Sequence, residues 1–149
     1  MVYDDVVKAG NDFPGANVHK SGWSEALAQS ARANSNMCAS LDRGGHHKWD
    51  KRFRDLINTK LATTFAEINA QSWERQRDST PVELWLEAFK CWKHSPGHWS
   101  VASKQYPLFG AALNQSRSGV WFMTIVVGGR PETAPAPAPE PRRRRWRLW

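Results

Sequence analysis

The chain has few cysteines, and this limits the classes of protein to which it can belong. Only two of its 149 residues are cysteine, Cys38 and Cys91. The disulfide framework that stabilises many small secreted domains is therefore missing, because two cysteines form at most one bridge. Both stand in apolar helical contexts, so we expect buried free thiols, with a Cys38–Cys91 disulfide as the alternative.

Long apolar runs are also missing. No stretch approaches the ~18–20 uninterrupted apolar residues of a membrane-spanning helix. Residues 1–5 contain neither a basic start nor the apolar core of a signal peptide. We therefore expect no transmembrane segment and no conventional secretion; the compartment stays unassigned, with a virion and the interior of a cell both open.

The chain does contain enough apolar material for one domain. Its hydrophobic content is 40%, and its length lies within the usual range of a single domain. We predict an N-terminal arm at residues 1–18, a globular domain at residues 19–129, and a Pro-rich linker with an Arg/Trp tail at residues 130–149.

Apolar residues spaced three and four apart predict two helices in the first half of the chain. Ser21 or Ser24 can cap the first helix, which continues to about Asn34. The second helix is expected at residues 48–63. Both have one apolar face, so each should pack on a flat surface.

A third helix is expected to begin at Thr80 and Pro81. Thr80 and Glu83 have the spacing of a capping box, and proline is tolerated in the first turn of a helix. The helix is apolar over more than one face, which predicts burial. We expect the Ser-Pro-Gly sequence at residues 95–97 to end it.

Three segments have the pattern of strands. Residues 64–70 alternate in polarity, and residues 108–113 and 120–127 are apolar runs joined by a polar, turn-forming segment. Helices combined with an antiparallel hairpin indicate the α+β class.

The order of these elements resembles the CAP superfamily of cysteine-rich secretory, antigen 5 and pathogenesis-related proteins, also called SCP-like domains. Residues 92–98 match the bacterial pattern Trp-x-x-Ser-Pro-Gly-His, and a glycine-bearing strand and an aromatic-rich strand follow. Three upstream blocks are similar to family motifs in the same order: Trp23, Leu27 and Ala31 of the first helix, His46-His47-Lys48-Trp49-Asp50-Lys51-Arg52, and Ala66-Glu67-Ile68-Asn69-Ala70. The resemblance implies a three-layer α/β/α sandwich with a small antiparallel sheet, followed here by a Pro-rich C-terminal tail.

The resemblance also implies a ligand cleft. His46 and His98 match the two site histidines of the family, and Glu67 matches its first site carboxylate. Ser95 stands where many eukaryotic members carry the second glutamate, and Glu87 is a further candidate for the cleft. Imidazole and carboxylate groups can bind a divalent metal such as zinc, with His46 and His98 as its ligands, or can exchange protons.

Each candidate residue also has a structural interpretation. His98 can hydrogen-bond the strand that follows it, Glu67 can pair with Arg52 or Arg54, and His46 can be a solvated loop residue. The sequence also has no Gly-x-Ser-x-Gly elbow. It leaves enzymatic activity undecided and favours a non-catalytic protein.

After Gly129 the chain alternates Pro and Ala and then becomes basic. Arginine interleaved with tryptophan suits an anionic partner, such as nucleic acid, a membrane surface or an acidic groove on a protein. A solvated tail is the alternative. The candidate partner-binding residues are Arg142, Arg143, Arg144, Arg145, Trp146, Arg147 and Trp149.

Two functions follow from these observations. The favoured one is a non-catalytic CAP-like binding or interaction module that docks through its tail on a larger partner or assembly, for example as a virion component. The alternative is a metal-assisted hydrolase, or a binder of small ligands such as lipids, that uses the cleft of His46, Glu67 and His98.

Overall fold

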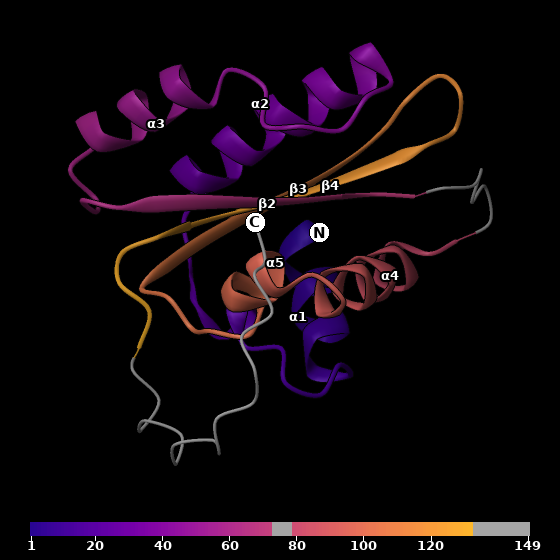
Figure 1. Ribbon diagram of the computed structural model, residues 1–149, viewed down its shortest axis with the longest axis horizontal. Coiled ribbons are helices and arrows are strands. Elements are labelled where there is room, and N and C mark those ends of the chain that lie inside the picture. The colour runs from indigo at the N-terminus through magenta and orange to yellow at the C-terminus, as the bar shows by residue number, and fades with distance from the viewer. Residues whose placement is uncertain (73–78, 133–149) are drawn as a thin grey trace, which may run out of the picture.

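The structure is a computed structural model that describes residues 1–72 and 79–132. It forms three layers, with α2 and α3 on one face of a sheet and α1, α4 and α5 on the other (Figure 1). The elements in chain order are α1 Val2–Asn11, the 3₁₀-helix Val18–Lys20, β1 Gly22–Trp23, α2 Glu25–Leu41, α3 Trp49–Asn58, β2 Phe65–Gln71, α4 Pro81–Lys93, α5 Pro96–Ala102, β3 Leu108–Gln115 and β4 Trp121–Gly128. The predicted α/β/α sandwich is confirmed.

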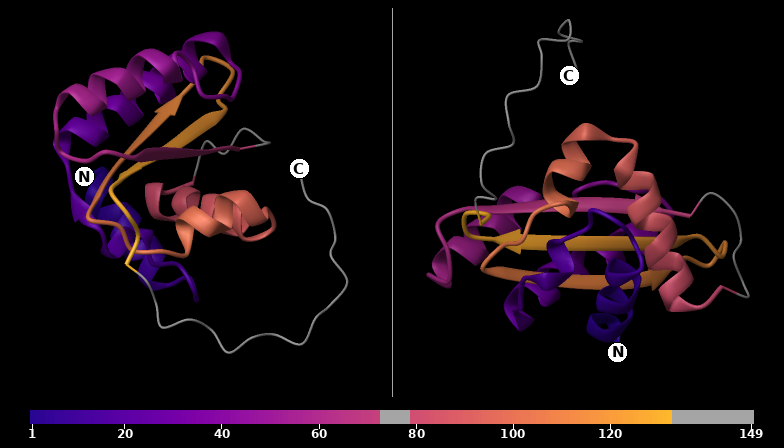
Figure 2. Two further views of the ribbon diagram at one scale, coloured as in Figure 1. Left: turned by 60° about the vertical axis from the view of Figure 1, so that its left-hand side comes forward. Right: turned by 90° about the horizontal axis from the view of Figure 1, so that it is seen from below.

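The sheet has the strand order β1-β3-β4-β2. The three long strands are antiparallel, as predicted, and the two-residue strand β1 pairs with β3 in parallel. Strand β4 lies between β2 and β3, so β2 is an edge strand (Figure 2).

Each face of the sheet has its own apolar core. On the side of α1, α4 and α5, the fully buried Trp85 and Phe89 pack against β-strand residues such as Ile125. On the opposite side, Leu27 of α2 and Leu56 of α3 cover the sheet. The alternation of strand side chains between two faces explains how one sheet serves both cores.

The predicted helix starts are correct, but α2 is longer than expected, and α3, expected at residues 48–63, ends at Asn58. Ser24 caps α2, and its hydroxyl accepts a hydrogen bond of 3.4 Å from the Leu27 N–H. The Thr80 hydroxyl likewise accepts from the Glu83 N–H at 3.2 Å. Helix α2 continues beyond Asn34 to Leu41, because its buried face extends through Asn34 to Cys38.

The segment at residues 95–97 does more than end a helix. Helix α4 ends at Lys93, and Pro96 then occupies the first turn of a new helix, α5. Proline lacks an N–H that this turn would leave unpaired in any case, so the same residue that stops one helix starts the next. His98 therefore lies on α5 and not in a loop before a strand.

Residues 1–18, which the sequence assigned to an N-terminal arm, contain helix α1. Val6 and Ala9 of this helix are fully buried and belong to the core on the α4 side. Gly10 lies directly against the buried His19, since a Cβ at Gly10 would be only 2.2 Å from His19 Nδ1. These residues are part of the packed structure.

The two cysteines differ in their surroundings, and neither forms a disulfide in the structure. Cys38 is buried, as expected, and burial raises the pKa of its thiol. The expected burial of Cys91 is wrong. Cys91 lies on the exposed face of α4, at a spacing of four from Glu87.

The described helices include none that is long and apolar enough to cross a membrane, which agrees with the sequence. The predicted partner-binding residues, from Arg142 to Trp149, lie outside the described residues.

Gly110 provides a test of this packing. A Cβ at this position would lie 2.1 Å from Ala28 N and 2.4 Å from Leu27 C, because α2 rests directly on β3. Gly110→Ala should destabilise the protein by ~1–3 kcal/mol, because the new methyl group would collide with the backbone of α2, which cannot shift without disturbing the helix. Urea unfolding measures this change. Gly97→Ala is the matched control, because nothing lies within 4 Å of its Cβ position; equal unfolding midpoints for the two variants would contradict the packing.

Candidate functional site

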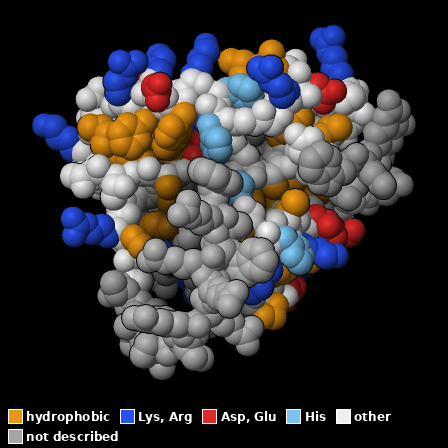
Figure 3. All heavy atoms as spheres, in the orientation of Figure 1, with side chains coloured by type: hydrophobic (Ala, Val, Ile, Leu, Met, Phe, Trp, Pro, Cys, Tyr) orange, Lys and Arg blue, Asp and Glu red, His pale blue; other side chains and the backbone are white. Residues whose placement is uncertain are grey.

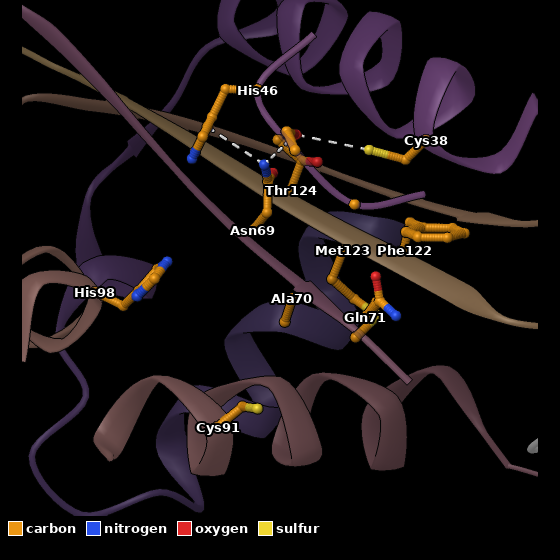
Figure 4. A pocket seen from close by; sticks show the side chains of 12 residues that line it. Cys38, His46, Asn69, Ala70, Gln71, Cys91, His98, Phe122, Met123 and Thr124 are labelled. Atoms are coloured by element: carbon orange, nitrogen blue, oxygen red, sulfur yellow. Dashed lines mark hydrogen bonds between the residues drawn. The ribbon is translucent and has the colours of Figure 1, made fainter. Parts of the chain in front are cut away.

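A cavity of about 300 Å³ lies along the edge strand β2. Its walls come from segments far apart in the sequence: the end of α2, the α2–α3 loop, β2, α4, α5 and β4 (Figure 4). The lining residues are Cys38, Gly44, Gly45, His46, Asn69, Ala70, Gln71, Cys91, His98, Phe122, Met123 and Thr124. Histidine side chains are visible near the middle of this face of the molecule, below a rim of Lys and Arg side chains (Figure 3).

His46 belongs to the α2–α3 loop and contacts Glu67 of β2. Its Nδ1 lies 2.9 Å from Glu67 Oε1. Because a carboxylate only accepts hydrogen bonds, the Nδ1–H group is the donor, and in the neutral ring the lone pair is then on Nε2. The His46 side chain is 47% exposed and the Glu67 side chain only 1% exposed, so His46 is the solvent-accessible member of the pair.

Arg52 of α3 holds the same carboxylate from the other side. Its Nη1 and Nη2 donate to Glu67 Oε2 and Oε1 at 2.5 Å and 3.0 Å. The remaining donors are also used: Nε bonds the His47 carbonyl at 2.9 Å, and Nη1 bonds the Ser30 hydroxyl at 3.1 Å. Of the two arginines proposed as partners of Glu67, Arg52 is the one that binds it.

Asn34 joins this ion pair to the loop and the sheet. Its Oδ1 accepts from the His47 N–H at 2.7 Å and from Arg52 Nη2 at 3.2 Å. Its Nδ2 donates to the Gly45 carbonyl at 2.9 Å and to Asn69 Oδ1 at 3.0 Å. Asn34 is fully buried, so one buried amide fixes the backbone on both sides of His46, at Gly45 and at His47.

His98 faces the cavity from α5, on the opposite side of β2 from His46 (Figure 4). Its Nδ1 lies 2.7 Å from the hydroxyl of Ser95, the residue before the helix. Burial, and to a smaller extent the charge of His46, lower the pKa of His98 below its ordinary value. Each histidine thus has its Nδ1 engaged by a neighbour.

The structure brings together three of the four residues proposed for the cleft. His46 and His98 line one cavity, and Glu67 bonds His46 and shares an adjoining hollow with His98. Glu87 is exposed on α4 and does not line the cavity.

The described residues supply few metal ligands. No group of three or more His, Cys, Asp or Glu side chains in residues 1–72 and 79–132 is arranged to hold a metal ion. Zinc sites ordinarily use three or four protein ligands. His46 and His98 can supply two ring nitrogens, because Glu67 is engaged by Arg52, so a bound ion would need further ligands from water or another molecule.

Sequence reasoning did not identify Asn34 as part of the site. A signal was available, since Asn34 lies three residues after Ala31 and four before Cys38, on the apolar face of α2. A polar residue at a core position must find buried hydrogen-bond partners. A polar residue of this kind therefore indicates a position where a helix hydrogen-bonds a neighbouring loop or strand.

Residues 13–127 match the cysteine-rich secretory protein family, CAP. The chain belongs to the CAP family. The matched region contains the ion pair, both cavity histidines and the long strands of the sheet.

Solved structures of other CAP-like proteins share this fold. An outer surface protein from Borrelia burgdorferi has a TM-score of 0.61 and 13% identity, over 86% of this chain and 89% of that one. NaASP2, crystallised with Zn²⁺, has a TM-score of 0.52 and 12% identity, over 87% of this chain and 75% of that one. At these identities the likeness concerns the fold. No curated protein matches the chain.

The titration of His98 tests the geometry of this CAP site. Replacing the neighbouring imidazole in His46→Gln should raise the pKa of His98, because a second positive charge no longer opposes its protonation. Burial should still keep that pKa below the ordinary value. NMR titration of the ring C–H signals measures the shift, with His47→Gln as the matched control.

An unchanged pKa of His98 in His46→Gln would contradict the proximity of the two rings.

The lowered pKa of His98 also predicts that the stability of the fold depends on pH, which urea unfolding at several pH values measures. Because the pKa of His98 is lower in the folded than in the unfolded chain, the unfolded chain binds the proton more readily, and stability decreases as the pH falls through the histidine range.

Proposed function

We propose that this CAP protein is a non-catalytic binding module that docks on a larger partner or assembly through its basic tail. The observation that most supports the absence of catalysis is the hydrogen bonding of the Glu67 carboxylate. Both of its oxygens accept hydrogen bonds from Arg52, and one also accepts from His46. Both oxygens are thus occupied and the side chain is only 1% exposed, so Glu67 is poorly placed to take a proton from a bound molecule, and general base catalysis by Glu67 is disfavoured.

The serine nearest the cavity histidines also lacks the arrangement of a nucleophile. Ser95 bonds His98 through Nδ1, and within the described part of the chain no carboxylate hydrogen-bonds the His98 ring to orient it as a base. A catalytic serine requires a base that is itself positioned by a third group. These features favour recognition over hydrolysis.

The tail carries the proposed docking function. It contains five arginines between residues 142 and 147, four of them consecutive, and residues 145–149 alternate arginine with tryptophan or leucine up to Trp149. The partner surface that suits them is anionic and offers apolar or stackable groups, as in a nucleic acid, an anionic membrane or an acidic protein of an assembly such as a virion. The domain would then present its cavity at that surface.

Heparin serves as a defined polyanion for testing the tail. The full chain should bind heparin in a salt-dependent manner, and replacing Arg142 to Arg145 by serine should weaken binding by roughly three orders of magnitude, at ~1 kcal/mol per arginine near an anionic surface. Calorimetry over a range of salt concentrations measures this loss. His46→Ala/His98→Ala should bind heparin like the wild type, and lysine at the four arginine positions should retain most of the affinity.

Equal heparin binding by the serine variant and the wild type would exclude the tail as the docking element. Loss of binding in the histidine variant would instead place recognition in the cavity.

The second candidate function is capture of a metal ion or small ligand in the cavity. It is favoured by the placement of His46 and His98 on the same cavity, each with Nδ1 engaged by a neighbour. Zinc prefers neutral imidazole nitrogen, and the related fold of NaASP2 was crystallised with Zn²⁺. When bound, the metal would act as a Lewis acid or as a bridge to a ligand.

Zinc calorimetry tests this second function. The wild type should bind one ion, binding should weaken as the pH falls because protons compete for the imidazoles, and His46→Ala/His98→Ala should lose it. His47→Ala is the matched control, since His47 does not line the cavity. Zinc binding that survives in the double variant would exclude these two residues as the ligands.

A further inference from the structure

Helix α3 carries an apolar stripe that the rest of the domain covers only in part. Trp49, Phe53 and Ile57 stand at a spacing of four along the helix, and all three are half-buried. Their inner sides pack on the core of the α2 side, where Phe53 meets Phe65 edge-on with 6.1 Å between the ring centroids. Leu61, just beyond the helix, continues the stripe and is 50% exposed. The outer sides of these side chains therefore remain accessible to a partner.

Basic side chains surround this stripe. Lys48, Arg54 and Lys60 are exposed, and none of them has an ion-pair partner among the described residues. Figure 3 shows an apolar patch over α3 with Lys and Arg side chains around it. Apolar side chains with a rim of positive charge suit a partner that is both apolar and anionic.

The acidic residues of the α2–α3 layer do not cancel this charge. Asp55 and Glu25 each form an ion pair with a basic residue of their own helix, and Asp42 lies at the far end of α2, as its C-cap. Asp50 is then the one carboxylate without an ion pair between residues 48 and 64, all of which the structure describes. Three unpaired cations and one unpaired anion give this surface a charge of +2.

Lys48 and Lys60 occupy backbone positions that favour glycine. Lys48, directly before α3, has a φ of 54°, and Lys60, two residues after the end of the helix, has a φ of 60°. A residue with a side chain is less favourable than glycine in this left-handed region, because its Cβ lies too close to the backbone. Both ends of α3 therefore carry a lysine where the backbone alone would not select one, which indicates a role for the charge itself.

A membrane fits this surface better than a nucleic acid does. Bases bind by stacking on an accessible aromatic face. One face of the Trp49 ring lies under Arg52, whose Cζ is 5.1 Å from the ring centroid, and Phe53 is tilted against the same ring with the centroids 5.8 Å apart. Ile57 and Leu61 cannot stack on a base. A row of aromatic and aliphatic side chains between cations is instead typical of a helix that lies in the interface of an anionic bilayer.

We propose that the α3 surface, which consists of the stripe from Trp49 to Leu61 with Lys48, Arg54 and Lys60, binds the surface of an anionic phospholipid membrane. Helix α3 would lie parallel to the membrane plane, with its apolar stripe among the lipid headgroups and its cations directed to the phosphates. Tryptophan is enriched at this depth, because its ring is apolar and its N–H is polar. The proposal goes beyond docking through the tail, since every residue of this surface belongs to the folded domain.

Sedimentation of the full chain with phospholipid vesicles tests the proposal. The wild type should bind vesicles made of equal parts of phosphatidylcholine and phosphatidylglycerol, and should bind pure phosphatidylcholine only weakly. Lys48→Gly/Lys60→Gly should weaken binding to the anionic vesicles ~30-fold, at about fivefold for each lysine near an anionic surface. The urea midpoint of this variant should stay close to that of the wild type, because relief of the left-handed conformation offsets the greater freedom of glycine in the unfolded chain.

Two matched controls distinguish this surface from the rest of the molecule. Lys8→Ala/Lys90→Ala removes the same charge from exposed positions of α1 and α4, on the other face of the sheet (Figure 1), and should bind like the wild type. Leu61→Ser should weaken binding about fivefold, as expected when half of a leucine side chain is no longer buried. Leu41→Ser should not weaken it, although Leu41, at the end of α2, is 49% exposed and thus as accessible as Leu61.

Each variant is measured with the tail intact and with Arg142 to Arg145 replaced by serine. A loss caused by Lys48→Gly/Lys60→Gly in both backgrounds would support the α3 surface, whatever the tail does with heparin. Vesicle binding that depends on the tail arginines alone would overturn the proposal, and so would equal binding by the two double-lysine variants. Lysine-dependent binding of a single-stranded oligonucleotide without binding to vesicles would also overturn it, by assigning the surface to nucleic acid.

Discussion

The candidate site depends on the ion pair between Arg52 and Glu67. Glu67 is almost completely inaccessible to solvent, and a buried carboxylate without a partner is unfavourable by several kcal/mol. Arg52 compensates for this cost with two hydrogen bonds and reaches it from α3. This ion pair therefore fixes α3, and the loop before it, against the edge strand β2.

Asn34 extends this constraint to the rest of the cavity wall. A side-chain amide has two donor and two acceptor positions, and Asn34 uses them on the His47 and Gly45 backbone, on Arg52 and on Asn69. The loop that carries His46 is thus held through its main chain. This arrangement lets the His46 side chain remain exposed while its backbone is fixed, which is the combination that a recognition site requires.

Local signals in the sequence predicted much of the fold. Ser24 and Thr80 cap their helices because a hydroxyl at this position satisfies a free N–H, and the long strands follow apolar runs. The resemblance to the CAP family placed His46, Glu67 and His98 near one another, which pattern alone could not do. The roles of Asn34 and Pro96 were not predicted, because they depend on which segments meet in three dimensions and on a second helix starting where the first one ends.

The placement of His46 and His98 on opposite sides of β2 has a mechanical consequence. His46 is attached to the α2–α3 layer and His98 to the layer of α4 and α5, so the two are joined mainly through the sheet between them. A molecule that binds both rings would link the two helical layers directly, without passing through the sheet. Separating these layers would then require breaking the contacts of the bound molecule as well, so the occupied protein would resist mechanical unfolding more than the empty one.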